Sequence, residues 1–356
     1  MKIIQVSPKY YPYIGGLEKN VIETSEGLLR RGHEVEVVAS DPSGELKKEE
    51  VVNGVKVTRL RSLAPGDAFN FCPSLHSFLK KKKCDILHIH GYHSLTSYSA
   101  SRANEIAGKV VFSPHYHGRG HSTFRNLLIK PYKFFGAKIF RVSDAVICNS
   151  RFEMLLLKRD FDVPERAFRL LPPGVNLEEF RIGSGQRDRK IMYAGRIEKY
   201  KGIQYLIQAL PYLEDVSLEV IGEGPYKKKL EKIASSLGLE NRVTLLSRLP
   251  REELLERYRK AGVFAMLSPY EAYGLTIAEA LLSGTPCVVV TSGAPVEFVD
   301  NEMCFGIELP VDVKMLADKI SEAMRSGHRK YEGKIYDWSA FVERLIKIYA
   351  QLFDVA

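Results

Sequence analysis

Short apolar segments alternate with longer amphipathic ones along nearly the whole chain, and this alternation constrains the fold most. In the clearest unit, the buried-strand pattern of 263–267 is followed by a loop, a helix over 275–283 and a second strand over 287–291. Repeated strand–helix–strand units build parallel sheets that helices cover on both faces. The chain is therefore predicted to be an α/β protein with doubly wound sheets.

The alternation is interrupted by a polar segment at 182–189, which reads as a linker. A chain of 356 residues is too long for one typical core. We therefore expect two Rossmann-like domains, at 1–182 and 187–335, and a terminal amphipathic helix within 338–356. Two such domains facing across a cleft would hold a ligand from both sides and exclude water on closing.

The predicted strands are 2–7, 34–39, 54–60, 85–90, 110–113, 145–149, 190–194, 217–221, 243–246, 263–267 and 287–291. The predicted helices are 17–31, 75–82, 125–141, 150–159, 203–210, 226–237, 251–260, 275–283 and 312–325. The strand at 54–60 alternates apolar and polar residues, which predicts a position at the edge of its sheet.

The composition is typical of a soluble globular protein, with 45% apolar and 27% charged residues. No apolar run reaches the roughly 18–20 residues of a membrane span, and the first residues enter a strand pattern instead of a secretory signal. The five cysteines are scattered and form no C-x-x-C pair, which favours a reducing compartment over a zinc framework. We expect a cytoplasmic protein.

Basic residues are concentrated in the first half of the chain. Residues 51–150 contain 15 Lys and Arg but 4 Asp and Glu, whereas 186–356 contain 24 of each kind. An anionic partner is one explanation, and a solvated basic face is the other. Residues 80–83 and the aromatic-rich segment 125–141 could bind the inner face of an anionic membrane, or 125–141 could be a packed helix with its cations outside.

Glycine-rich turns and cations follow several predicted strands. Gly15 and Gly16 join the first strand to a helix, where a backbone can approach an anion. Arg196 and Lys201 follow the first strand of the second domain, and such cations stabilise the charge that builds on a leaving diphosphate. The turn at Ile221-Gly222-Glu223-Gly224-Pro225 is a weaker signal, because many turns resemble it.

Two carboxylates lie in the unit that spans 263–291. Glu271 is in its loop, and Glu279 lies about one turn into its helix. Loops at the carboxyl ends of parallel strands are where open α/β sheets bind ligands. Chance also places two glutamates at this spacing, so the pair needs support from the rest of the chain.

Histidines cluster between the fourth and sixth predicted strands: six of the nine are His88, His90, His93, His115, His117 and His121. A metal site is one interpretation, but no carboxylate or cysteine stands at ligand spacing, so we expect no metal. The favoured interpretation places one or two histidines in the cleft as substrate contacts. His115, after Ser113-Pro114, is best placed for this role, and His90 and His117 are candidates for binding an acceptor.

In this order, the motifs resemble the retaining glycosyltransferases of family 4 (group 1), which have the GT-B fold. The resemblance runs from Ile3 to the final helix. The motifs that carry it are Gly15-Gly16-x-Glu18, His115, Pro173-Gly174-Val175-Asn176, Gly195-Arg196, Lys201-Gly202, Gly222-x-Gly224-Pro225, Glu271 to Glu279 and Gly284-Thr285-Pro286. Two departures are Tyr273, where the family often has Phe, and Pro173, where it often has Asn.

The resemblance implies a nucleotide-sugar donor in the second domain, with no metal or other cofactor. Arg196 and Lys201 would bind its diphosphate, with Gly16 closing from the first domain, and Glu279 would bind its ribose. Glu271 would lie beside the transferred sugar, and His115 near sugar and acceptor. The remaining expected donor contacts are Gly222, Gly224 and the backbone of Tyr273, Gly274, Leu275 and Thr276; the remaining acceptor contacts are Tyr11 and Glu18.

The predicted reaction transfers the sugar to an acceptor hydroxyl with retention of anomeric configuration. The acceptor would be a sugar, or a lipid-linked or other membrane-associated glycan. No acid–nucleophile pair of the glycosidase type is evident, so the resemblance favours front-face attack, in which the departing phosphate takes the acceptor proton. Alternatives are a nucleotide-sugar epimerase on a similar fold and, less favoured, a nucleic-acid-binding protein. The resemblance also implies that the final helix, with Trp338, crosses back onto the first domain.

Overall fold

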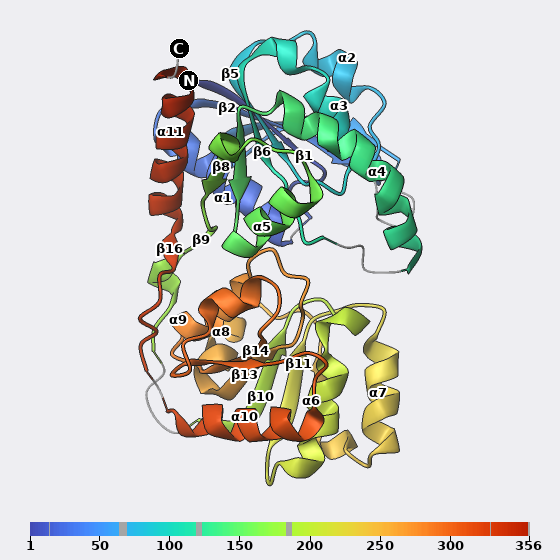
Figure 1. Cartoon of the computed structure of the whole chain (residues 1–356), viewed down its shortest axis with the longest axis vertical. Coiled ribbons are helices and arrows are strands. Elements are labelled where there is room, and N and C mark those ends of the chain that lie inside the picture. The colour runs from blue at the N-terminus through green and yellow to red at the C-terminus, as the bar shows by residue number, and fades with distance from the viewer. Residues whose placement is uncertain (14, 64–69, 119–122, 183–186, 328, 355–356) are drawn as a thin grey trace. The chain divides into compact units, whose positions relative to one another are not determined.

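The computed structural model describes residues 1–13, 15–63, 70–118, 123–182, 187–327 and 329–354, with the backbone alone over 123–131. The chain forms two compact units, one of Met1–Gly174 with Tyr336–Ala356 and the other of Val175–Ile335. The second unit contains a parallel sheet and the first a sheet that is parallel except for one edge strand, and helices pack on both (Figure 1). The change of unit comes before the predicted linker, whose residues 183–186 lie outside the described residues.

The sheet of the first unit has the strand order β3-β4-β2-β1-β5-β6-β7-β8. Its strands are β1 (Lys2–Ser7), β2 (Glu34–Asp41), β3 (Glu49–Val52), β4 (Val55–Arg61), β5 (Cys84–His90), β6 (Ala107–Ser113), β7 (Ala145–Cys148) and β8 (Phe168–Leu170). Neighbouring residues such as Ile3 and Ile4 are both buried, in apolar clusters on opposite faces of the sheet. Burial on both faces explains the nearly continuous apolar runs in the sequence.

The prediction that the strand at 54–60 forms a sheet edge is wrong. Strand β3 pairs antiparallel with β4 and takes the outer position. Asn53 and Gly54 connect the two strands with positive φ angles of 50° and 85°, as a tight hairpin turn requires. The Asn-Gly pair was the available signal for this hairpin.

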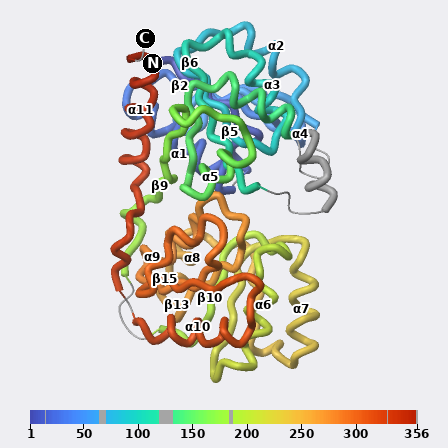
Figure 2. The backbone as a smooth tube through the Cα atoms, in the orientation of Figure 1, coloured from blue at the N-terminus to red at the C-terminus, as the bar shows by residue number. Residues whose placement is uncertain are grey.

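The helices of the first unit are α1 (Gly16–Arg30), α2 (Leu75–Leu79), α3 (Leu95–Ser101), α4 (Thr123–Val142), α5 (Arg151–Asp160) and α11 (Trp338–Asp354). The terminal helix α11 lies alongside α1 within this unit (Figure 2). Its buried face includes Phe341, Leu345 and Tyr349. At the rim, Arg31 donates to the Ser339 hydroxyl at 2.6 Å and pairs with Glu343 at 3.2 Å. Apolar burial therefore makes this helix part of the first unit's core.

The sheet of the second unit has the order β12-β11-β10-β13-β14-β15, and its pairs are parallel. Its strands are β10 (Asp188–Ala194), β11 (Ser217–Ile221), β12 (Val243–Leu246), β13 (Ala261–Met266), β14 (Cys287–Val290) and β15 (Cys304–Ile307). Its helices are α6 (Ile203–Ala209), α7 (Lys227–Ser236), α8 (Arg251–Lys260), α9 (Leu275–Leu282) and α10 (Val313–Arg325). Outside both sheets, β9 (Gly174–Val175) pairs with β16 (Tyr336–Asp337).

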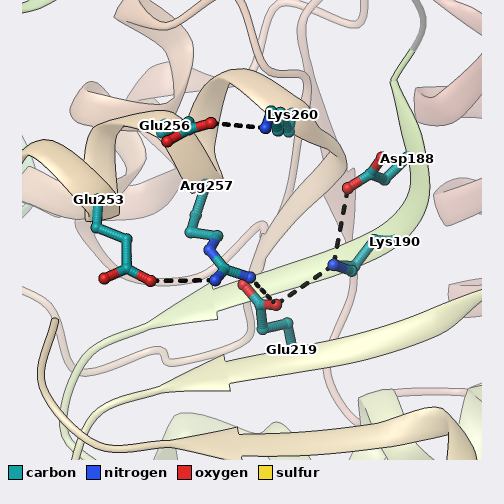
Figure 3. Close-up of polar contacts among 7 residues, drawn as sticks. All are labelled: Asp188, Lys190, Glu219, Glu253, Glu256, Arg257 and Lys260. Atoms are coloured by element: carbon teal, nitrogen blue, oxygen red, sulfur yellow. Dashed lines mark hydrogen bonds and ion pairs between the residues drawn. The ribbon is translucent and has the colours of Figure 1, made fainter.

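A charged network attaches helix α8 to this sheet (Figure 3). The nearly buried carboxylate of Glu219, on β11, accepts from Arg257 of α8 at 2.9 Å and from Lys190 of β10 at 3.3 Å. Arg257 also pairs with Glu253, one turn earlier on α8, at 3.1 Å. Two cations thus compensate one desolvated carboxylate, and such a group is costly to leave unpaired.

No helix within the described residues is long and apolar enough to cross a membrane. Of the two basic segments, 80–83 pairs Lys80 with Glu105 and Lys82 with Glu36. In 125–141, the side chains up to residue 131 lie outside the described residues. Beyond them, Tyr132 is buried, whereas Phe134 is 66% exposed with Lys138 Nζ 4.6 Å from its ring centre.

Candidate functional site

The predicted donor residues of the second unit gather at the carboxyl edge of its sheet. The strand order of this sheet reverses between β10 and β13, which are neighbours. The loop after β10 carries Arg196 and Lys201, and the loop after β13 carries Glu271. A reversal of this kind opens a crevice above the strand ends, where α/β sheets bind ligands.

Lys201 and Glu271 form an ion pair across this point, with Nζ and Oε1 2.5 Å apart. Both side chains are largely buried, at 12% and 17% exposure. Burial acts to lower the pKa of Lys201, but the charges of Glu271 and Tyr200 outweigh it, so that the pKa lies above its ordinary value. The Lys201 ammonium is therefore charged and held in place before any ligand arrives.

Arg196, on the same loop, is arranged differently. Its side chain is 70% exposed and pairs with Glu198 at 3.2 Å. Its carbonyl accepts from the Tyr193 hydroxyl at 2.7 Å, which anchors the backbone below an open guanidinium. One loop therefore presents a buried, paired cation and an exposed one. Their joint contact with a diphosphate stays a prediction.

Glu279 is buried on α9 and has charged and polar neighbours. Its Oε1 lies 2.9 Å from Arg251 Nη1, and its Oε2 accepts from the Tyr258 hydroxyl at 3.4 Å. Arg251 also pairs with Glu179 at 2.8 Å, and its guanidinium lies 5.5 Å from the ring centre of Phe180. The carboxylate is therefore oriented by side chains from α8.

Sequence reasoning missed Arg251 and Tyr258. They stand seven positions apart in the predicted helix 251–260, which places both on one helical face. That spacing was visible, but only the fold shows that the face meets Glu279.

Helix α9 begins at the predicted donor loop. Gly274 precedes it with φ of 111°, in the region that favours glycine. The N–H groups of Leu275 and Thr276, in its first turn, have no backbone acceptor among the described residues. Tyr273 packs its ring against Phe298, with the ring centres 5.1 Å apart. The helix opening thus offers free donors beside a fixed aromatic side chain.

Gly222 and Gly224 are needed for packing between two loops. A Cβ at Gly222 would lie 1.9 Å from the carbonyl oxygen of Gly195, and one at Gly224 would lie 2.2 Å from that of Ile197. The Ile197 N–H also donates to Glu223 O at 2.8 Å. These glycines therefore support the loop that carries Arg196; their direct contact with a donor stays a prediction.

In the first unit, His115 lies in the loop after β6 with φ of 50°, an uncommon conformation for a residue with a side chain. Asn149 Nδ2 can only donate, and it lies 3.1 Å from His115 Nδ1, so the ring proton belongs on Nε2. That Nε2 is buried and has no partner among the described residues. Burial lowers the pKa of His115 to about 4. The neutral ring therefore has an N–H donor without an acceptor, and a bound ligand could supply that acceptor.

The histidines behind His115 are internal. His90 is fully buried, bonds Gln5 at 2.8 Å and stacks 6.1 Å from the His115 ring. His88 lies between the hydroxyls of Tyr349 and Ser113, at 2.7 and 2.8 Å. Burial lowers the pKa of His90 well below its ordinary value and that of His88 to about 3. Contact of His90 with an acceptor stays a prediction; in the structure it supports His115.

Two further histidines of this cluster also stack on each other. His117 stacks on His93 with the ring centres 4.6 Å apart, and His121 lies outside the described residues. Within the described part of the chain, no three histidine, cysteine or carboxylate side chains are grouped to hold a metal ion.

Glu153, which sequence reasoning did not single out, connects the loop after β6, which carries His115, to Asn149 after β7. Its fully buried carboxylate accepts from the N–H of Tyr116 at 2.5 Å and from that of Asn149 at 2.7 Å. Burial raises its pKa to about 8, against the opposing effect of these hydrogen bonds. In the sequence, this glutamate resembles an ordinary acid in the first turn of helix α5, so its role was hidden.

The predicted acceptor contacts Tyr11 and Glu18 and the predicted donor contact Gly16 lie around the start of α1. Tyr11 is 47% exposed, and its carbonyl accepts from Arg59. Glu18 folds back over Gly15, where an added Cβ would lie 2.5 Å from Glu18 Oε2. Gly16, the first residue of α1, is exposed. The structure therefore leaves Tyr11 and Gly16 accessible, and their ligand contacts stay predictions.

Known proteins resemble the chain along most of its length. Residues 14–179 match the family described as Glycosyltransferase Family 4, and residues 176–337 match Glycosyl transferases group 1. An uncharacterized glycosyltransferase of Methanocaldococcus jannaschii is 27% identical, over 85% of this chain and 84% of that protein. The GPI3 subunit of phosphatidylinositol N-acetylglucosaminyltransferase from Saccharomyces cerevisiae is 25% identical, over 96% and 81% respectively.

A similar solved structure is that of HepE from Anabaena in complex with UDP and glucose. Its TM-score is 0.79 at 17% identity, with coverage of 98% of this chain and 99% of that one. This likeness, together with the two largely parallel sheets, confirms the predicted α/β class and GT-B architecture. With consecutive family matches over both halves of the chain, the protein is a glycosyltransferase that belongs to family 4, the group 1 glycosyltransferases.

Proposed function

We propose that this glycosyltransferase moves a sugar from a nucleoside-diphosphate-sugar to a hydroxyl of a lipid-linked or other membrane-associated acceptor, with retention and without a metal ion. The observation that carries the proposal is the buried Lys201–Glu271 pair beside the free N–H groups that open α9. This combination suits an anionic diphosphate bound at a strand-order reversal. The UDP and glucose in the HepE complex, and the lipid named for the yeast relative, support the two substrate classes.

In the proposed reaction, the acceptor oxygen forms a bond to the anomeric carbon as the bond from that carbon to the diphosphate breaks. Both events occur on one face of the sugar, and the departing phosphate oxygen takes the acceptor proton. Lys201 and Arg196 stabilise the charge that develops on the leaving group. Removal of one such donor typically costs about 3–4 kcal/mol of barrier.

The remaining residues position the substrates. Glu279, oriented by Arg251, binds the ribose hydroxyls of the donor. His115 donates from Nε2 to a hydroxyl of the sugar or acceptor, because Asn149 already occupies Nδ1. With its pKa near 4, the imidazole is neutral at physiological pH. Glu271 keeps Lys201 charged and contacts the transferred sugar.

The first test is a thermal-shift screen with UDP-, GDP- and ADP-sugars, since a ligand that binds the native state raises its unfolding midpoint by mass action. The stabilising donor is then incubated with a membrane lipid extract, with and without EDTA, and the product is examined by NMR. We expect an acceptor-dependent product with the donor's anomeric configuration, unaffected by EDTA. An inverted product would disprove retention. An epimerised donor formed without acceptor would replace the transferase proposal with the epimerase.

Membrane association is proposed at the inner face of the cytoplasmic membrane. The exposed ring of Phe134, with Lys138 beside it, and the exposed Lys81 and Lys83 provide apolar and cationic contacts. Each cation near anionic lipid contributes about 1 kcal/mol. Co-flotation with phosphatidylglycerol vesicles at low salt tests this, with Phe134→Ser as the variant expected to weaken binding. Equal flotation of the variant and the native chain would show that α4 does not contribute to membrane binding.

A further inference from the structure

A pocket of about 460 Å³ lies at the carboxyl edge of the first sheet, away from the histidines. Strands β2 and β4 end at its wall, at Asp41 and Arg61, and the opposite wall is formed by α2 and the residues after it. In the sheet, β1 separates the pocket strands β2 and β4 from β5 and β6, the strands next to the histidines. The pocket and the histidines lie at the same carboxyl edge of the sheet.

The lining of this pocket is strongly cationic. Lys48, Arg59, Arg61 and Lys81 line it, together with one carboxylate, Asp41. That carboxylate is occupied by its own loop: it accepts from the Ser43 hydroxyl at 2.6 Å and from the Leu46 N–H at 3.1 Å. Burial acts to raise the pKa of Asp41, but these hydrogen bonds outweigh it and lower the pKa. Asp41 therefore shapes the pocket wall and does not neutralise the four cations.

The cations differ in how they are held. Within the described part of the chain, Lys48, Arg61 and Lys81 form no ion pair, and all three side chains are exposed at the rim. Arg59 is buried, with its guanidinium bound to Glu50 and to the Tyr11 carbonyl. Its Nε is buried and has no partner among the described residues. A buried, orphaned donor in the wall of a cationic pocket indicates a missing anionic acceptor.

We propose that this pocket binds a phosphate ester of the acceptor. Arginine and lysine together suit tetrahedral phosphate oxygens, and the hydroxyls of Ser74 and Ser77 on the lining add neutral donors. Because Arg59 also holds the Tyr11 loop, a bound phosphate fixes the acceptor beside that loop. This inference rests on the proposed function and narrows its acceptor to one that carries a phosphate, either in a lipid headgroup or in a soluble phosphorylated polyol.

The test compares a double variant, Lys48→Ala with Arg61→Ala, with a matched control, Lys56→Ala. Lys56 is an exposed cation on the same strand as Arg61 and is outside the pocket lining. Binding of glycerol 3-phosphate is measured by calorimetry on the full chain. Binding of vesicles of phosphatidylcholine with one fifth phosphatidylglycerol is measured by flotation. The unfolding midpoint confirms that each variant folds.

We expect the double variant to lose tenfold or more in affinity and the Lys56 control to match the native chain. Loss with glycerol 3-phosphate supports a soluble phosphorylated acceptor, loss with vesicles supports a lipid headgroup, and loss with both supports their shared phosphate. Equal affinity of the double variant and the native chain for both probes overturns the pocket. The thermal shift with the donor nucleotide-sugar is measured on the same samples. If it is absent from the native chain, the proposed function fails; if it is intact in the double variant, a loss of phosphate binding belongs to the pocket alone.

Discussion

The two units carry similar sheets, but the carboxyl edges of these sheets differ in chemistry. In the first unit, His88 and His90 are buried and the half-buried His115 stacks on His90. Burial lowers the pKa of all three rings and keeps them neutral. In the second unit, the pairs Lys201–Glu271 and Arg251–Glu279 keep full charges in place. The same scaffold can therefore present hydrogen-bond donors without charge at one edge and compensated charge at the other. In the reaction proposed above, the first edge would bind the acceptor hydroxyl and the second edge the departing diphosphate.

The largest effect is expected from removal of the charge at the second edge. Lys201→Ala should lower kcat by 10²–10³, because the leaving group loses a preorganised cation. The matched control is Lys199→Ala, which removes an exposed lysine from the same loop. Steady-state kinetics and the unfolding midpoint are measured for both variants. Equal loss of activity in the two variants would mean that the general charge of the loop matters, and not the buried pair.

A second prediction compares two arginines of helix α8 that pair with different carboxylates of the second unit. Arg251 orients Glu279, whereas Arg257 compensates Glu219. Arg251→Ala should raise KM for the donor about tenfold with a smaller change in kcat, because a hydrogen bond to a charged group contributes about 1.5–3 kcal/mol. Arg257→Ala should lower the unfolding midpoint and leave KM unchanged. If Arg257→Ala raised KM equally, helix packing and not carboxylate orientation would explain the effect.

Local sequence patterns were sufficient for most strands and helices. Strands such as Ser217–Ile221 and Val243–Leu246 match their predicted bounds, because their apolar runs are bounded by polar turns. Among the described residues, the short strands that were missed are β3, β8, β9, β15 and β16. The residues of β3 are half acidic, and β15 is a four-residue segment after a polar turn, so neither forms a clear apolar run. Both depend on a neighbouring strand that the pattern does not identify.

Site pairings were harder to predict than site residues. Lys201 and Glu271 were both singled out, yet seventy positions separate them and only the fold brings them together. Glu153 and Arg251 were missed because each resembles an ordinary charged residue at the start of a helix. Their importance comes from burial and from the partner that they meet, which are tertiary properties.

A third prediction concerns the alkaline side of the pH profile. The charge of Glu271 helps to keep the pKa of Lys201 above its ordinary value, so the ammonium remains charged as the pH rises. In Glu271→Gln, burial acts without that carboxylate and lowers the pKa of Lys201. We expect the alkaline limb of kcat to move to lower pH. If the alkaline limb did not move, the activity would not depend on the charge of Lys201.

The smallest effect is expected at the neutral edge and appears in stability. His115 has a folded-state pKa near 4, below the ordinary value of 6.5, so the unfolded chain binds this proton more readily than the folded chain does. Its contribution to stability is therefore present above pH 6.5 and is lost as the pH falls toward 4. Urea unfolding at several pH values in this window should give a shallower slope for His115→Asn than for the native chain, by at most one proton. His76→Asn is the control, since this histidine lies on α2, outside the stacked group. An unchanged slope for His115→Asn would show that the ring is charged in the folded chain, and the contrast between a neutral and a charged edge would no longer hold.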